Sequence, residues 1–114
     1  MRNISFALTT EQFLDGSKTV TRRIGWTFLK VGDLLCAVRK CQGLKAGDKL
    51  DRLGVIRVTG VRRERLSAIT AADVAKEGFF GKSPTWFAEF FCGTHVNCDW
   101  NSTVTRIAFE RVRT

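Results

Sequence analysis

Short apolar runs alternate with polar, glycine-containing stretches along the whole chain. The apolar run at residues 3–8 and the Thr- and Val-rich stretch at residues 18–24 predict two strands. Residues 34–38, 53–61 and 103–112 predict three more, and in the last two the apolar and polar positions alternate with the period of a strand. The pattern therefore predicts about five strands.

Two or three short helices are expected between these strands. The first ends at Gly16, because glycine adopts the left-handed conformation that closes many helices. The second follows Thr70, whose hydroxyl suits a helix N-cap, and ends at residues 77–78. The third starts at Pro84, which fits the first turn of a helix. It carries aromatic residues at helical spacing along one buried stripe: Trp86, Phe87, Phe90 and Phe91.

Short strands that are widely separated and mostly not joined by tight hairpins indicate a mixed-topology barrel. The expected fold class is therefore α+β and mostly β, a small β-barrel of about five strands with two or three short helices. The stretch 43–49 is polar and contains glycine, so it is expected to be an exposed loop. A chain of 114 residues suits a single domain, residues 1–114.

The charge balance narrows the expected partners. Lys and Arg number 19 against 11 Asp and Glu, which gives a formal charge of +8. Such an excess attracts polyanions such as RNA, although some basic proteins are merely soluble. No apolar run approaches the ~20 residues of a membrane span, and no signal peptide is recognisable. We therefore expect a cytoplasmic monomer that makes no membrane contact.

The four cysteines are Cys36, Cys41, Cys92 and Cys98, and the absence of an export signal favours reduced thiols. Cys92, His95 and Cys98 form a C-x-x-H-x-x-C run in which thiolates and imidazole could bind zinc, with Cys36 or Cys41 as the fourth ligand. The spacing matches no standard zinc finger. Packing is therefore the favoured interpretation, and no metal or other cofactor is expected.

Residues 16–23, Gly-Ser-Lys-Thr-Val-Thr-Arg-Arg, are the most informative segment. They resemble the signature of ASCH domains, G-x-K-x-x-E-x-R, with Gly16, Lys18 and Arg23 in the fixed places and Thr21 where the family often has Glu. The order of the elements extends the resemblance over nearly the whole chain. It implies the PUA-like barrel fold and a cleft beside the motif that is proposed to bind RNA.

One small bacterial branch of ASCH domains also has Thr in place of the Glu and hydrolyses the amide of acetylcytidine. By that resemblance Lys18 would be the proton acceptor, Thr21 the nucleophile and Glu77 the proton donor. A threonine hydroxyl needs such a base, and lysine can serve if burial or nearby cations depress its pKa. We expect Lys18 in the turn before the strand, because on a regular strand it would point away from Thr21 and Arg23, and we expect Lys18 and Thr21 at the mouth of the cleft.

Two further roles complete the predicted site. A carboxylic acid can protonate a departing amine if an apolar setting raises its pKa, and Phe79 and Phe80 lie beside Glu77. Trp26 is a candidate platform for base stacking. The residues expected to bind RNA or a modified nucleoside are Gly16, Ser17, Arg22, Arg23 and Trp26.

Arginines on or beside the predicted strands could add phosphate contacts, although a solvated strand face explains at least half of them. These are Arg57, Arg62, Arg63, Arg65, Arg106, Arg111 and Arg113. Three alternatives to the amidohydrolase stay open. The same cleft could bind RNA without turnover, it could hydrolyse a phosphodiester as a ribonuclease, or the chain could be a small basic domain that docks an acidic protein.

Overall fold

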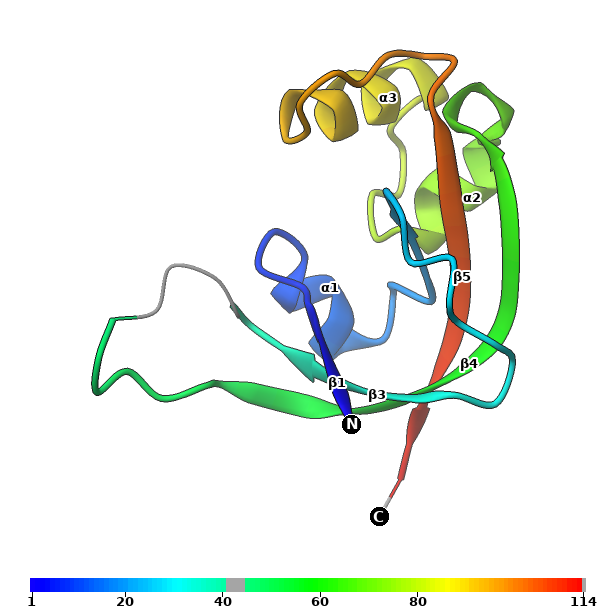
Figure 1. Ribbon diagram of the computed structural model, residues 1–114. Coiled ribbons are helices and arrows are strands. Elements are labelled where there is room, and N and C mark those ends of the chain that lie inside the picture. Colours follow the sequence, from blue (N-terminus) through cyan, green and yellow to red (C-terminus); the bar gives the residue numbers. More distant parts are fainter. Residues whose placement is uncertain (41–44, 114) are drawn as a thin grey trace.

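A computed structural model describes residues 1–40 and 45–113. Its centre is a single curled sheet of five strands in the order β1-β3-β4-β5-β2 (Figure 1). The strands are β1 (Arg2–Ser5), β2 (Val20–Arg23), β3 (Leu34–Val38), β4 (Arg52–Arg65) and β5 (Thr103–Val112). The prediction of five strands is confirmed.

The sheet is mixed, because β1 pairs with β3 in parallel and the other neighbours pair antiparallel. The two long strands, β4 and β5, form its backbone, and their register shifts between Val58 and Gly60. Such an irregularity bends a strand pair. Within residues 1–40 and 45–113 no ladder joins β1 to β2, so the predicted barrel is a half-barrel that is open between these two strands.

Three α-helices and one short 3₁₀ turn, Leu66–Ala68, complete the domain. Helix α1 (Thr10–Asp15) lies inside the curl of the sheet, whereas α2 (Ala71–Lys76) and α3 (Pro84–Gly93) gather at the far end of β4 and β5 (Figure 1). The Thr70 hydroxyl accepts a hydrogen bond from the Asp73 amide, as expected of an N-cap. Pro84 occupies the first turn of α3.

The interior consists of two hydrophobic clusters. One fills the curl and joins α1 to the sheet, with Ile4, Phe13 and Ile56 completely buried. The other joins α2 and α3 to the far ends of β4 and β5, through residues such as Val74 and Val104. The candidate site described below lies between the two clusters.

Several boundaries differ from those predicted. Strand β4 continues to Arg65 rather than residue 61, because its polar end pairs with β5 as far as Thr103. Strand β1 stops at Ser5, and the chain turns over the next residues instead of extending to residue 8. Residues 45–49 are exposed, as predicted for that loop, while 43 and 44 lie outside the described residues. In the described part of the chain, no helix is long and apolar enough to cross a membrane.

Candidate active site

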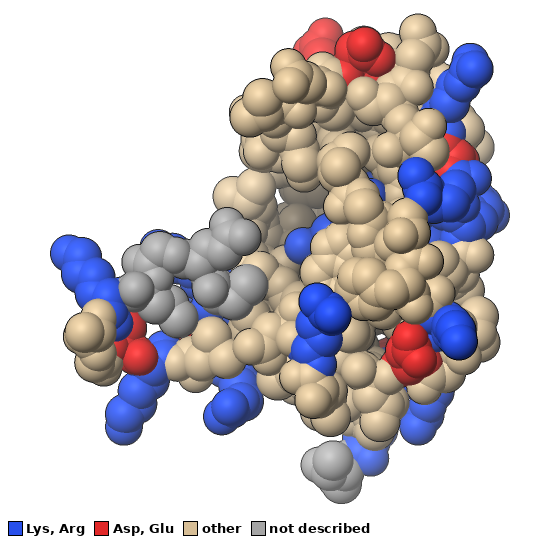
Figure 2. Space-filling model, in the orientation of Figure 1, with Lys and Arg blue, Asp and Glu red and all other residues tan. Residues whose placement is uncertain are grey.

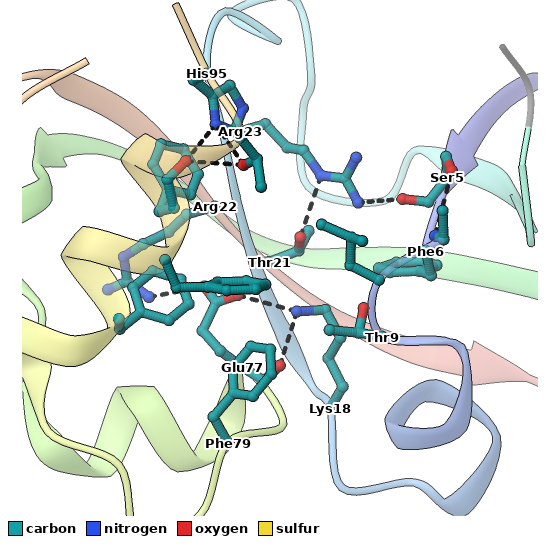
Figure 3. A pocket seen from close by; sticks show the side chains of 16 residues that line it. Ser5, Phe6, Thr9, Lys18, Thr21, Arg22, Arg23, Glu77, Phe79 and His95 are labelled. Atoms are coloured by element: carbon teal, nitrogen blue, oxygen red, sulfur yellow. Dashed lines mark hydrogen bonds and ion pairs between the residues drawn. The ribbon is translucent and has the colours of Figure 1, made fainter. Parts of the chain in front are cut away.

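A pocket of about 340 Å³ opens where the half-barrel is incomplete, between the end of β1 and strand β2 (Figure 3). Helix α3 and the segment after α2 form the opposite side. The surface is visibly hollowed between α3 and the sheet (Figure 2). Three predicted catalytic residues line this pocket together: Lys18, Thr21 and Glu77.

Lys18 lies in the turn between α1 and β2, as predicted. Gly16 ends α1 in the left-handed conformation, at φ 85°, and the Lys18 amide then donates a hydrogen bond to the Gln12 carbonyl. The ammonium donates to the carbonyl oxygen of Glu77 at 2.8 Å and to its Oε1 at 2.9 Å. Lys18 is only 5% exposed and Thr21 only 3%, so the expectation that both stand at the mouth of the cleft is wrong. They form its floor.

Gly78 explains how Glu77 comes so close to Lys18. Its backbone has φ +101°, and a Cβ atom there would lie 2.7 Å from the Cβ of Gln12 and 3.6 Å from that of Lys18. The 2.7 Å separation is shorter than real Cβ atoms show, so the close approach of the α1 and α2 segments requires glycine at position 78. Gly78 is thus needed for Glu77 to lie beside Lys18 at the pocket floor.

Behind the floor lies a buried network of ion pairs. Arg22, whose side chain is fully buried, donates to Glu77 Oε2 at 3.0 Å, to Asp73 Oδ2 at 2.6 Å and to Glu64 Oε2 at 3.0 Å. Arg106 also bonds both oxygens of Asp73. Arg22, predicted to bind RNA or a nucleoside, lines the pocket, and its guanidinium lies among these carboxylates, where it holds Glu77 in place.

The network and its burial shift the pKa values of Lys18 and Asp73. Burial lowers the pKa of Lys18 below its ordinary value of 10.5; the Glu77 carboxylate opposes this shift, and the charges of Arg23 and Arg22 add to it. Hydrogen bonds from Arg106, and secondarily from Arg22, hold the pKa of Asp73 well below its ordinary value, although burial acts in the opposite direction. A lysine with a depressed pKa is more readily neutral, as a general base must be.

Thr21 and Arg23 share the pocket face of β2. The Nε of Arg23 donates to the Thr21 hydroxyl oxygen at 3.1 Å, and its Nη2 donates to the Ser5 carbonyl at 2.6 Å. Arg23 also lies over the Phe6 ring, 5.3 Å from its centroid. It therefore bridges the open side of the half-barrel while contacting the predicted nucleophile.

The far wall of the pocket is aromatic, and the sequence interpretation missed this role. The rings are Phe79, Phe87, Phe90 and Phe91. The spacing of Phe87, Phe90 and Phe91 on α3 predicts a buried stripe, and Phe87 and Phe91 are indeed buried, but the same spacing also aims rings at a cavity. Phe79 does flank Glu77, as predicted, whereas Phe80 is 92% exposed and provides no apolar setting for that carboxylate.

The remaining predicted binding residues lie away from the pocket lining. Gly16 caps α1, and the amide of the exposed Ser17 donates a hydrogen bond to Asp15 Oδ1. Trp26 is half-buried, packs against the sheet cluster and contacts Phe28 at a ring distance of 5.4 Å. Of the strand arginines, Arg57 pairs with Glu110 and Arg62 with Glu64 near the surface.

The cysteine–histidine run follows α3 and contradicts the expectation of reduced thiols. Cys92 and Cys98 form a disulfide, with their Cα atoms 5.0 Å apart, and Cys36 is a free thiol. The described residues contain no group of three or more His, Cys, Asp and Glu side chains that could hold a metal ion, and Cys41 lies outside them. His95 and Thr94, inside the disulfide loop, line the pocket.

Comparisons with known proteins identify the fold. No family model matches the chain, and no curated protein matches it either. The similar solved structures include two that each have a TM-score of 0.68. One is a DUF984-family protein of Enterococcus faecalis, 15% identical, in which the alignment covers 98% of this chain and 76% of that one. The other is the ASCH domain from Lactobacillus crispatus, 17% identical, with 96% and 78% covered.

The class of structure is thus a small α+β half-barrel with a pocket at its open side. More particularly, the chain has the ASCH-domain fold that residues 16–23 predicted.

Proposed function

We propose that this protein hydrolyses the amide bond of an N-acylated nucleoside such as acetylcytidine. One observation carries the proposal: the three side chains that such chemistry needs, Lys18, Thr21 and Glu77, line a single pocket. Its volume of about 340 Å³ lies at the small end of the range of about 300–1,000 Å³ that is typical of small-molecule sites. A nucleoside fits that range better than an RNA strand does.

The proposed reaction begins with proton transfer. Neutral Lys18 accepts the Thr21 hydroxyl proton, and the threonine oxygen attacks the acyl carbon. Negative charge then develops on the former carbonyl oxygen, and the guanidinium of Arg23, which already contacts the Thr21 oxygen at 3.1 Å, lies near enough to the reacting group to stabilise it. The C–N bond breaks as the amine takes a proton, leaving an acyl-threonine ester. Water hydrolyses the ester, releases the carboxylic acid and restores Thr21.

The ion pairs refine the role of Glu77. Its two carboxylate oxygens each accept a hydrogen bond from a cation, Lys18 on one side and Arg22 on the other. These two bonds hold the Glu77 carboxylate directly beside the Lys18 Nζ atom. In the proposal Lys18 takes the proton from Thr21, and Glu77 relays it to the departing amine. The middle step of this relay, from Lys18 Nζ to Glu77 Oε1, spans 2.9 Å.

The aromatic wall suits a planar ligand such as a pyrimidine base. The α3 rings and Phe79 offer faces and edges on which a pyrimidine can pack, which is worth about 1–3 kcal/mol per base in nucleic-acid complexes. The acyl group would then point down to the polar floor.

A second candidate function is binding of RNA without turnover. The observation that favours it is the formal charge of +8, with Lys and Arg side chains gathered along the edge where β4 and β5 run (Figure 2). Phosphate contacts of this kind give an affinity that falls steeply with salt.

Two assays separate the candidates. Purified protein is incubated with acetylcytidine, and release of cytidine and acetate is followed by chromatography; the amidohydrolase proposal requires catalytic turnover. Binding of a short single-stranded RNA is measured in parallel at low and moderate salt. Salt-sensitive RNA binding without any release of cytidine would replace the first proposal with the second.

A further inference from the structure

The disulfide loop at the end of α3 is the part of the pocket that the proposed reaction does not use. Cys92 and Cys98 close it, and the Thr94 and His95 side chains line the pocket between them. His95 is half-buried, whereas Lys18 and Thr21 are buried at the floor. The loop therefore forms part of the rim, away from the bond that would be cleaved (Figure 3).

The His95 ring has a defined orientation. It stacks on Phe91 with a centroid distance of 4.2 Å and an interplanar angle of 20°. Its Nδ1 lies 2.8 Å from the Phe91 carbonyl oxygen. Because a carbonyl oxygen can only accept, Nδ1 carries the proton in this arrangement. The other ring nitrogen, Nε2, is then a hydrogen-bond acceptor in the neutral imidazole.

Thr94 is held by the same carbonyl. Its hydroxyl donates to the Phe91 carbonyl oxygen at 2.8 Å, and its oxygen lies 3.1 Å from Nδ1 of His95. Both rim side chains are thus tied to one carbonyl of α3, and Nε2 of His95 is an acceptor that takes no part in these contacts.

We propose that His95 accepts a hydrogen bond from a sugar hydroxyl of the ligand and thereby selects nucleosides over free bases. The inference rests on the proposed function for its ligand class. With the acyl group on the floor at Thr21 and the base against the aromatic wall, the sugar lies at the rim. Sugar hydroxyls are hydrogen-bond donors, which an Nε2 acceptor recognises. The Cys92–Cys98 disulfide acts as a positioning element, since it closes the loop that carries His95.

The test compares two ligands that differ only in the sugar. The ratio of kcat/KM for acetylcytidine to that for acetylcytosine, the same amide without ribose, is measured for the wild type and for His95→Phe. Phenylalanine keeps a ring to stack on Phe91 but has no acceptor. One neutral hydrogen bond corresponds to about 3- to 10-fold, so the ratio should fall by that factor while activity on acetylcytosine changes little. Val96→Ala, at an 89% exposed position of the same loop, is the matched control and should leave the ratio unchanged.

A binding measurement keeps the inference independent of turnover. Affinities for cytidine and cytosine are compared by titration calorimetry on the same three proteins. If the wild type hydrolyses neither amide but prefers cytidine in a His95-dependent way, the proposed function fails and this inference stands. If the wild type does not prefer cytidine, or His95→Phe weakens both ligands equally, His95 is only a packing residue and the inference is overturned.

Discussion

The floor and the far wall of the pocket are built in opposite ways. The floor is polar and buried, and ion pairs that reach back to Arg22 hold it in place. The wall is aromatic and partly open, and ring packing on α3 and the Cys92–Cys98 disulfide hold it. The floor joins Lys18 and β2 to Glu77, 59 positions from Lys18, whereas the wall comes from α3 and Phe79.

Because of this difference, the floor should tolerate substitutions less well than the wall. A buried charge is stable only while its partners remain, because removing one partner leaves the other desolvated and unpaired. Aromatic packing loses contacts more gradually. Substitutions of the charged floor residues should therefore damage both folding and chemistry, while substitutions in the wall should mainly alter ligand selection.

The largest expected loss of stability follows from Arg22→Met, which keeps most of the volume but removes the charge. Glu77 and Asp73 would each lose a buried partner, so the free energy of unfolding should fall by about 3–5 kcal/mol. Urea denaturation measures this. Arg57→Met is the matched control, because its pair with Glu110 is about half exposed and should contribute less than about 1 kcal/mol. Similar losses in the two variants would show that the buried network has no special role.

Acid should act on the same network. The pKa of Asp73 is lower in the folded protein than its ordinary value of 3.8, so its contribution to stability is complete above that pH and is lost as the pH falls below it. Urea denaturation from pH 7 to pH 2 should show a progressive loss of stability from this group below pH 3.8. Asp73→Asn should be less stable than the wild type at pH 7, and its free energy of unfolding should fall less steeply as the pH is lowered. A fall as steep as that of the wild type would assign the acid sensitivity to other carboxylates.

Gly78→Ala tests whether the floor depends on the close approach of two segments. The added Cβ would meet Gln12 at 2.7 Å in a backbone conformation that side chains rarely adopt, so we expect a loss of about 2–3 kcal/mol in thermal or urea unfolding. Gly81→Ala separates the two causes: Gly81 has φ +86° and nothing within 4 Å of its Cβ position, so only the strain of about 1 kcal/mol should remain. Equal effects at both positions would mean that the contact with Gln12 costs nothing.

The smallest expected effect on stability comes from the wall. Cys98→Ser opens a loop with a sequence separation of 6, for which loop entropy predicts a loss of about 2 kcal/mol under non-reducing conditions. A reducing agent should abolish the difference between variant and wild type. Cys36→Ser, at the free thiol, keeps the disulfide and should lose as much stability as the wild type when reductant is added. A wild-type melting temperature that does not respond to reductant would contradict a stabilising disulfide.

The sequence predicted the fold better than the pocket. Apolar alternation located β4 and β5, and Thr70 and Pro84 marked the starts of α2 and α3, because these signals are local. The extension of β4 to Arg65 was not predictable, since it depends on pairing with β5 rather than on apolar residues. The open side of the half-barrel likewise follows from strand order, which no local pattern encodes.

For the site, the motif at residues 16–23 directed attention to Lys18 and Thr21, and the structure brings Glu77 beside them. Their burial was missed because a lysine and a threonine in a polar segment look exposed. The aromatic wall was interpreted as core, since helical spacing does not distinguish a core from a cavity wall. The disulfide was missed because the compartment argument outweighed the spacing of Cys92 and Cys98.

The central claim is that Thr21 is a nucleophile activated at the pocket floor. It is tested most directly by the steady-state hydrolysis of acetylcytidine by the wild type, Thr21→Val and Thr21→Ser. Valine preserves the shape of threonine without the hydroxyl, and serine restores a hydroxyl without the methyl group. Thr21→Val should lower kcat by at least about 10³-fold with its fold intact by circular dichroism, while Thr21→Ser should retain measurable turnover. A folded Thr21→Val variant that hydrolyses acetylcytidine at the wild-type rate would contradict it.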